Sequence, residues 1–121
     1  MIELSLKQYS IKEIGDIIDS DDKICLAFGL LDRVQRGRTF LEEYVKKAER
    51  PIYGINTGFG SLCDVEISHD QLGQLQENLV KSHACGIGDE VRPEIVRYML
   101  LLKILGLSKG NSGIRLETIQ M

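Results

Sequence analysis

The sequence predicts a mainly α-helical domain with a short N-terminal strand. Apolar residues recur every three or four positions through most of the 121 residues, which is the spacing of a buried helix face. Helix start signals precede several of these stretches, among them Ser10 with Glu13 three residues later and Pro93 at a first helical position. Residues Ile2 to Leu6 instead alternate apolar and polar side chains, as a strand does.

The first helix is expected to begin at the capping box of Ser10 and Glu13 and to end at Asp19 to Asp22. Four isoleucines are expected on its buried side: Ile11, Ile14, Ile17 and Ile18.

A second helical stretch runs from Ile24 to Arg50, and Asp21 or Asp22 can cap it. A proline follows Arg50 and ends the stretch, because the residue before proline avoids the helical region. Gly37 interrupts it, so it forms either one long helix with a weak point or two helices, the second opened by a capping box of Thr39 and Glu42. The apolar positions stay in register across the glycine, which favours one helix.

Ser68, with Gln71 three residues later, marks the start of a third helix. Gly86 can end this helix in the left-handed conformation. One face of the helix carries apolar residues and a histidine at helical spacing: Leu72, Leu75, Leu79 and His83.

Pro93 opens a strongly apolar helix that includes Ile95 to Leu105 and is expected to be buried on most sides, possible partners being other subunits or further chain. Residues 106–113 form a glycine-rich break. Asn111 or Ser112 can cap a last short helix that contains Arg115, Leu116 and Ile119.

The composition excludes several classes of function. The net charge is −3 and no cluster of basic residues is interleaved with aromatic residues, so the sequence does not indicate nucleic-acid binding. The longest apolar run, Tyr98 to Leu102, is far shorter than a membrane span. Cys25, Cys63 and Cys85 have no metal-ligand spacing, which predicts free thiols in a reducing cytoplasm.

The segment from Ile52 to Gly60 carries three glycines around Tyr53. Glycine allows positive φ and a close approach of backbone to a ligand. From spacing alone, a plain connector and a functional loop have about equal weight. A phosphate-binding loop is disfavoured, because the glycines fit neither the dinucleotide fingerprint nor the P-loop.

Tyr53 and His83 are the candidate site residues. A free tyrosine has a pKa near 10, so a tyrosine that acts as a base near neutral pH needs cations or amide groups that stabilise its phenolate; a tyrosine packed at the root of the loop is the alternative. His83 is either a hydrogen-bonded core residue or a ligand-binding one, whereas His69 is expected to be solvated. No metal site is expected, since no histidine or carboxylate has ligand spacing. A catalytic dyad of Cys85 and His83 is disfavoured, because residues two apart on a helix do not face each other.

Three motifs in order carry a resemblance: YGINTGFG from Tyr53, LQENLVKSHACGIG from Leu75, and VRYMLLLKILGLSKGNSGIRLE up to Glu117. Together they resemble the N-terminal region of the histidine ammonia-lyases, a branch of the aromatic amino acid lyases and aminomutases. The resemblance runs from about Leu4 to the end of the chain.

The resemblance implies that the chain is the N-terminal helical domain of a member of the fumarase/aspartase-like ammonia-lyase superfamily. It also implies that the whole protein is a cytoplasmic homotetramer that eliminates ammonia from an amino acid without oxidation. It implies that Tyr53 is the catalytic base or acid–base residue on a mobile loop. It also implies that His83 contacts the substrate imidazole, because a Ser82–His83 pair is similar to the histidine-specific branch. The expected reaction converts L-histidine into trans-urocanate in histidine catabolism; a phenylalanine or tyrosine lyase, or an aminomutase, is the alternative within the family.

The family's electrophile is a methylidene-imidazolone (MIO) that forms from an internal Ala-Ser-Gly, and this sequence has no such tripeptide. Ala84–Gly86 and Asn111–Gly113 belong to other motifs and are not assigned to it. Residues 1–121 are therefore expected to be an N-terminal fragment without the central helical bundle, inactive alone and prone to self-association through the apolar helix. A non-catalytic helical interaction module is the competing hypothesis.

Overall fold

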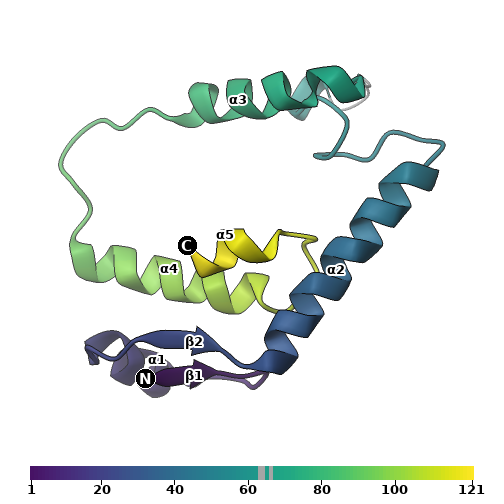
Figure 1. Cartoon of the computed structure of the whole chain (residues 1–121). Helices are drawn as coiled ribbons and strands as arrows, with labels where there is room; N and C mark the ends of the chain where they lie inside the picture. Colours follow the sequence, from purple (N-terminus) through teal and green to yellow (C-terminus); the bar gives the residue numbers. More distant parts are fainter. Residues whose placement is uncertain (63–64, 66) are drawn as a thin grey trace. The chain divides into compact units, whose positions relative to one another are not determined.

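The computed structural model describes residues 1–62, 65 and 67–121, without the side chains of residues 62 and 69. The chain divides into two compact units (Figure 1). Unit 1 comprises residues 1–43 and 90–121, and unit 2 comprises residues 44–89.

Unit 1 contains a two-stranded parallel sheet of β1 (Ile2–Leu4) and β2 (Ile24–Leu26). Ile2 pairs with Ile24 and Leu4 with Leu26. The expected N-terminal strand is confirmed, although it ends at Leu4. The assignment of residues 24–26 to a helix is wrong, because hydrogen bonds to β1 fix this segment as a strand; the Ala27 N–H continues the ladder to the Leu4 carbonyl at 2.8 Å.

Helix α1 (Ile11–Asp19) begins at the predicted capping box. The Glu13 N–H donates to the Ser10 hydroxyl at 3.2 Å, and the Ser10 N–H donates to the Glu13 carboxylate at 2.8 Å. Ile17 and Ile18 are buried as expected. The prediction for Ile11 is wrong: it is 91% exposed, because the core that α1 covers reaches its later turns and not its first residue.

Helix α2 (Phe28–Lys47) is a single helix that continues through Gly37, as the register predicted, and it begins later than expected because β2 precedes it. A Cβ atom at Gly37 would collide with the carbonyl oxygen of Gly110, so the glycine permits a close approach of two backbone segments. The predicted cap is wrong, because the Asp22 carboxylate accepts a hydrogen bond from the N-terminal ammonium group at 3.0 Å.

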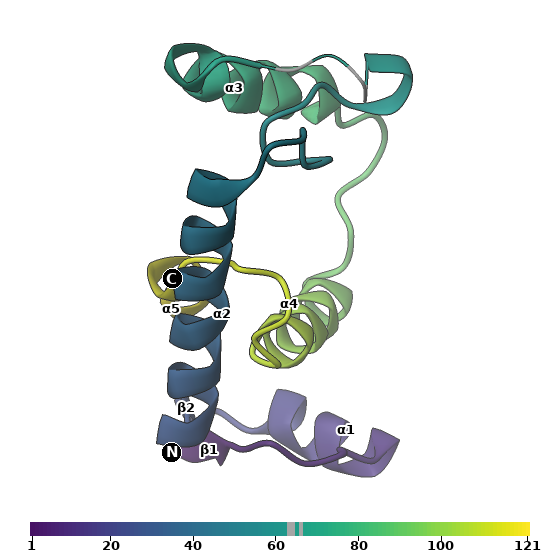
Figure 2. The same cartoon turned by 90° about the vertical axis from the view of Figure 1, so that its right-hand side faces the viewer.

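The core of unit 1 lies between the sheet, α1, the start of α2 and α4 (Pro93–Leu107). Helices α1 and α4 are in contact, and Figures 1 and 2 show α4 beside α1. The buried residues of this cluster are Leu4, Ile17, Ile18, Leu30 and Leu101.

Helix α4 begins at Pro93 as predicted, but in the described part of the chain Leu101 is its one buried residue. The expected burial on most sides is therefore not met by this chain. Six of its large apolar side chains are at least 37% exposed: Ile95, Val96, Tyr98, Met99, Leu100 and Leu102. None of the described helices is both long and apolar enough to cross a membrane.

The last helix, α5 (Leu116–Gln120), follows the glycine-rich segment. Arg115 stands at its N-cap without a side-chain hydrogen bond, so neither predicted cap is correct. The Ser112 hydroxyl instead accepts from the Ile114 N–H at 3.4 Å. Gly110 and Gly113 have φ of +76° and +64° and shape the turn before the helix.

Unit 2 contains the end of α2, two short 3₁₀ helices, η1 (Gly60–Leu62) and η2 (His69–Gln71), and helix α3 (Leu72–His83). Ser68 is the N-cap residue of η2, which leads directly into α3, so the predicted helix start is confirmed; the Ser68 side chain, however, makes no capping hydrogen bond. Gly88, with φ of +96°, adopts the left-handed conformation that was expected at Gly86. Cys63 and the side chain of His69 lie outside the described part of the chain.

Candidate active site

The glycine loop from Ile52 to Gly60 is closed by its own hydrogen bonds. The Ile55 and Asn56 N–H groups both donate to the Ile52 carbonyl, at 3.0 and 3.2 Å. The Asn56 side-chain carbonyl accepts from the Ile52 N–H at 2.6 Å, so one asparagine ties both sides of the turn. Gly54, with φ of +76°, supplies the left-handed residue that this turn requires. The segment is therefore an ordered turn.

Thr57 lies at the centre of this loop and is 1% exposed. Its hydroxyl oxygen accepts from the Gly54 N–H at 3.3 Å, and the hydroxyl donates to the Gly58 carbonyl at 2.8 Å. One buried side chain therefore satisfies two backbone groups that would otherwise lack a partner. The sequence analysis did not single out Thr57. A hydroxyl residue inside a glycine-rich turn was the available signal, because such side chains bond to nearby backbone.

Two backbone hydrogen bonds tie the loop to the segment that follows η1. The Gly58 N–H donates to the Val65 carbonyl at 3.1 Å, and the Ile67 N–H donates to the Asn56 carbonyl at 2.9 Å. Residues 56 and 58 are therefore both hydrogen-bonded to the segment that follows η1.

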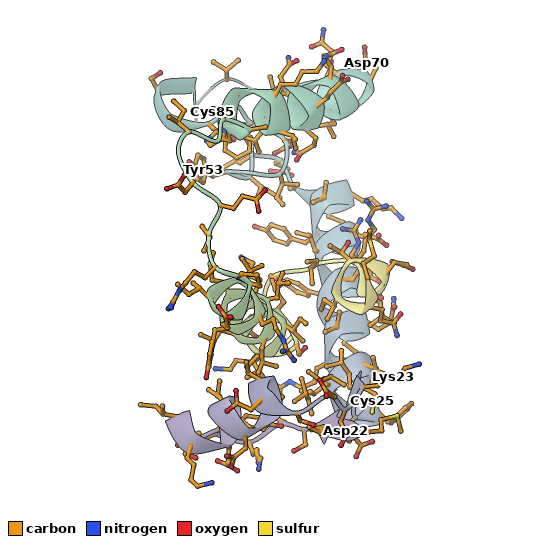
Figure 3. All side chains as sticks on the ribbon, turned by 90° about the vertical axis from the view of Figure 1, so that its left-hand side faces the viewer. Asp22, Lys23, Cys25, Tyr53, Asp70 and Cys85 are labelled. Carbon is orange, nitrogen blue, oxygen red and sulfur yellow. The ribbon has the colours of Figure 1, made fainter. Side chains whose placement is uncertain are left out.

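Tyr53 stands in this framework with its side chain 63% exposed (Figure 3). Its ring meets Phe59 edge to face, with the ring centroids 6.0 Å apart and an interplanar angle of 69°. Within the described residues, the Tyr53 hydroxyl has no hydrogen-bond partner. The loop therefore fixes the base of the ring and leaves the oxygen free to meet a small molecule, in contrast to a tyrosine packed at the root of the loop.

His83 is the last residue of α3, and its side chain is exposed. The interpretation of His83 as a core residue is therefore wrong, although the ring is hydrogen-bonded. Its Nδ1 lies 2.9 Å from the Leu79 carbonyl oxygen and 3.0 Å from the Ser82 hydroxyl oxygen. The half-buried residues of the predicted stripe are Leu72, Leu75 and Leu79. His83 thus continues the stripe out of the packed region.

Both candidate residues belong to unit 2. The described contacts of Tyr53 are with Phe59, and those of the His83 ring are with Leu79 and Ser82. The structure places the two residues in one unit and describes no contact between their side chains.

Cysteine and metal chemistry receive no support from the described residues. Cys85 is exposed, and its backbone N–H donates to the His83 carbonyl at 2.9 Å, but no hydrogen bond joins its sulfur to the described imidazole. The described side chains contain no group of three or more histidine, cysteine, aspartate or glutamate residues that could hold a metal ion.

The residues present do not fit an internally formed methylidene-imidazolone, because the sequence has no Ala-Ser-Gly. Ala84 is the C-cap residue of α3, and Asn111 to Gly113 line a hollow of about 640 Å³ in unit 1 together with residues of α2. That hollow contains neither Tyr53 nor His83. The 121 residues therefore contain no precursor of that electrophile.

Comparison with known proteins agrees with the fold and with the motifs around the two residues. The family model for aromatic amino acid lyases matches residues 9–121. The histidine ammonia-lyase of Deinococcus radiodurans is 38% identical over 115 residues, which are 95% of this chain and 22% of that protein. The histidine ammonia-lyase of Alkaliphilus metalliredigens is 50% identical over 88 residues, which are 73% of this chain and 17% of that protein.

Solved structures give the same result. Phenylalanine aminomutase of Pantoea agglomerans matches with a TM-score of 0.89 and 30% identity over 99% of this chain and 23% of that chain. Histidine ammonia-lyase of Trypanosoma cruzi matches with a TM-score of 0.71 and 36% identity over 87% of this chain and 21% of that chain. The predicted mainly helical fold with a short N-terminal strand is confirmed.

The chain belongs to the aromatic amino acid lyase family. It spans 22% of the Deinococcus histidine ammonia-lyase and 24% of the one from Natranaerobius thermophilus.

Proposed function

We propose that this chain is the N-terminal part, residues 1–121 forming one domain, of a histidine ammonia-lyase that converts L-histidine into trans-urocanate and ammonia. In this proposal Tyr53 is the catalytic base and His83 binds the substrate imidazole. The observation that carries it is the Tyr53 hydroxyl, which has no partner among the described residues, on a loop whose Asn56 and Thr57 side chains hydrogen-bond to the loop's own backbone.

The chemistry explains why a tyrosine is needed at this position. Elimination removes a proton from the carbon next to the one that bears the amino group, and the amino group leaves as ammonia. That carbon-bound proton is barely acidic, so the base must have a free lone pair within reach of it. The Tyr53 oxygen suits this role because no described group occupies it.

Ammonia is a poor leaving group, and the family's methylidene-imidazolone electrophile is what activates it. This chain does not contain the Ala-Ser-Gly from which the group forms. We therefore expect residues 1–121 alone to be inactive and the complete protein, proposed as a cytoplasmic homotetramer, to be active. In the complete protein, Tyr53 of this chain would be the base and His83 would contact the imidazole ring of the substrate.

The test follows urocanate absorbance with L-histidine as substrate. In the complete protein, Tyr53→Phe should lower kcat roughly 10²- to 10⁴-fold, the usual contribution of a general base. Tyr98→Phe, which removes a tyrosine hydroxyl from α4, should leave kcat nearly unchanged. Faster turnover of L-phenylalanine or L-tyrosine than of L-histidine would contradict the proposed substrate. Turnover by residues 1–121 alone that Tyr53→Phe abolishes would contradict the expected inactivity.

A further inference from the structure

Ser82, Leu79 and His83 form a small hydrogen-bonded triangle at the end of α3. The Ser82 hydroxyl donates to the Leu79 carbonyl at 2.9 Å. The His83 Nδ1 lies 2.9 Å from the same carbonyl oxygen and 3.0 Å from the Ser82 hydroxyl oxygen. All three distances are within ordinary hydrogen-bond range.

The triangle distinguishes the two neutral forms of the imidazole. A carbonyl oxygen can accept a hydrogen bond and cannot donate one. If Nδ1 carried no proton, its lone pair would face the Leu79 oxygen at 2.9 Å, and one Ser82 proton would have to serve both neighbours. If Nδ1 carries the proton, it donates to the Leu79 carbonyl and the Ser82 oxygen, while the Ser82 hydroxyl donates to Leu79. Every contact in the triangle is then favourable.

We propose that Ser82 is a positioning residue that, with the Leu79 carbonyl, holds neutral His83 in the Nδ1–H tautomer, so that Nε2 accepts a hydrogen bond from a ring N–H of the substrate. This inference rests on the proposed function for the identity of the substrate. The hydrogen bond made by one ring nitrogen decides the role of the other. A substrate ring without an N–H donor would leave Nε2 without its partner.

The specificity that results is for a donor and not merely for an aromatic ring. A site that hydrogen-bonds a substrate N–H discriminates strongly against analogues that lack it. Imidazole carries such an N–H, whereas a phenyl ring does not. The Ser82–His83 pair therefore selects histidine through the direction of one hydrogen bond.

The tautomer is tested first, in the whole 121-residue chain labelled with ¹⁵N-histidine. Long-range ¹⁵N–¹H correlation spectra at about pH 9, where an ordinary histidine ring is neutral, report which ring nitrogen carries the proton. The chain has two histidines, and His69→Gln assigns the signals. We expect Nδ1–H at His83, a smaller Nδ1–H fraction in Ser82→Ala, and the native fraction in Ser82→Thr. An Nε2–H ring in the native chain, or no change in Ser82→Ala, would overturn the proposal.

The substrate half is tested by kinetics of the complete protein. Ser82→Ala should raise KM for L-histidine roughly threefold to tenfold, the range of one net hydrogen bond, with a smaller change in kcat, and Ser82→Thr should restore KM. Both L-histidines methylated on one ring nitrogen lack a ring N–H when the imidazole is neutral, so both should bind more weakly than L-histidine. Equal KM values for both isomers and L-histidine would overturn the proposed acceptor role. A complete protein that does not turn over L-histidine would refute the proposed function and its substrate contact, while the spectra would still decide the tautomer.

Discussion

The Thr57 hydroxyl is the feature of the loop whose removal should have the largest effect on the position of Tyr53. Thr57→Val keeps the branched shape of the side chain and deletes the hydroxyl. The buried Gly58 carbonyl would lose its 2.8 Å partner, at a cost of about 1–3 kcal/mol. The half-buried Gly54 N–H would lose a 3.3 Å bond worth about 0.5–1.5 kcal/mol. The loop should therefore lose about 1.5–4.5 kcal/mol of local stability.

Amide hydrogen exchange measures this loss directly. The Gly58 and Ile67 N–H groups bond to the carbonyls of Val65 and Asn56, so their exchange reports opening of the loop. A loss of about 1.5–4.5 kcal/mol corresponds to exchange that is faster by roughly tenfold to a thousandfold, at about tenfold for each 1.4 kcal/mol. Thr57→Ser is the matched control, because it keeps the hydroxyl, and it should exchange within a few fold of the native chain. Equal exchange in the valine and serine variants would refute the role given to the hydroxyl.

Three further predictions concern unit 1. Gly37→Ala should lower the free energy of unfolding in urea by about 1–3 kcal/mol, because the added Cβ collides with the backbone of Gly110. Gly29→Ala in the same helix is the control: its Cβ meets open space, so it should be neutral or stabilising. Equal effects of the two substitutions would contradict this explanation. Hydrogen bonding to Lys7, and then to Ser10, lowers the pKa of Glu13 from 4.5 to about 2, so its contribution to stability is complete above about pH 4.5 and is lost as the pH falls toward 2. Glu13→Gln should therefore flatten the fall of Tm over this pH window in circular dichroism, and an unchanged slope would count against it. The exposed apolar face of α4 should cause self-association, and Leu100→Glu should reduce it. A molar mass from light scattering that stays at the monomer value as the concentration of the native chain rises would contradict this prediction.

Local signals in the sequence were sufficient for the starts of α1 and α4. The Ser10–Glu13 capping box and Pro93 act through the backbone of their own helix turn, so α1 and α4 begin where the sequence predicts. Strand β2 was missed because three residues have no periodicity of their own, and pairing with β1 determines their conformation. Gly37 likewise depends on a contact that the local sequence does not show. Its place inside a helix is explained by Gly110, which lies far away in the sequence.

The sequence offered candidate site residues but not their surroundings. Tyr53 and His83 were identified from motifs, and motifs do not show what a side chain touches. The exposure of His83 depends on where the apolar stripe of α3 stops packing, which is a tertiary property. The hydrogen bonds of Thr57 depend on the left-handed turn at Gly54, whose conformation the glycine permits but does not require.

The exposure of the two site residues bears on what the chain could do alone. Electrostatic stabilisation of a developing charge is strong where water is excluded and weak where it is not. Tyr53 is 63% exposed and His83 is also on the surface, so water would compete for both side chains. For Tyr53 to act as the proposed base, further groups would have to cover it and stabilise its phenolate. We therefore expect that an electrophile supplied in solution would not make these 121 residues a lyase, because the proposed site would also need a cover for Tyr53.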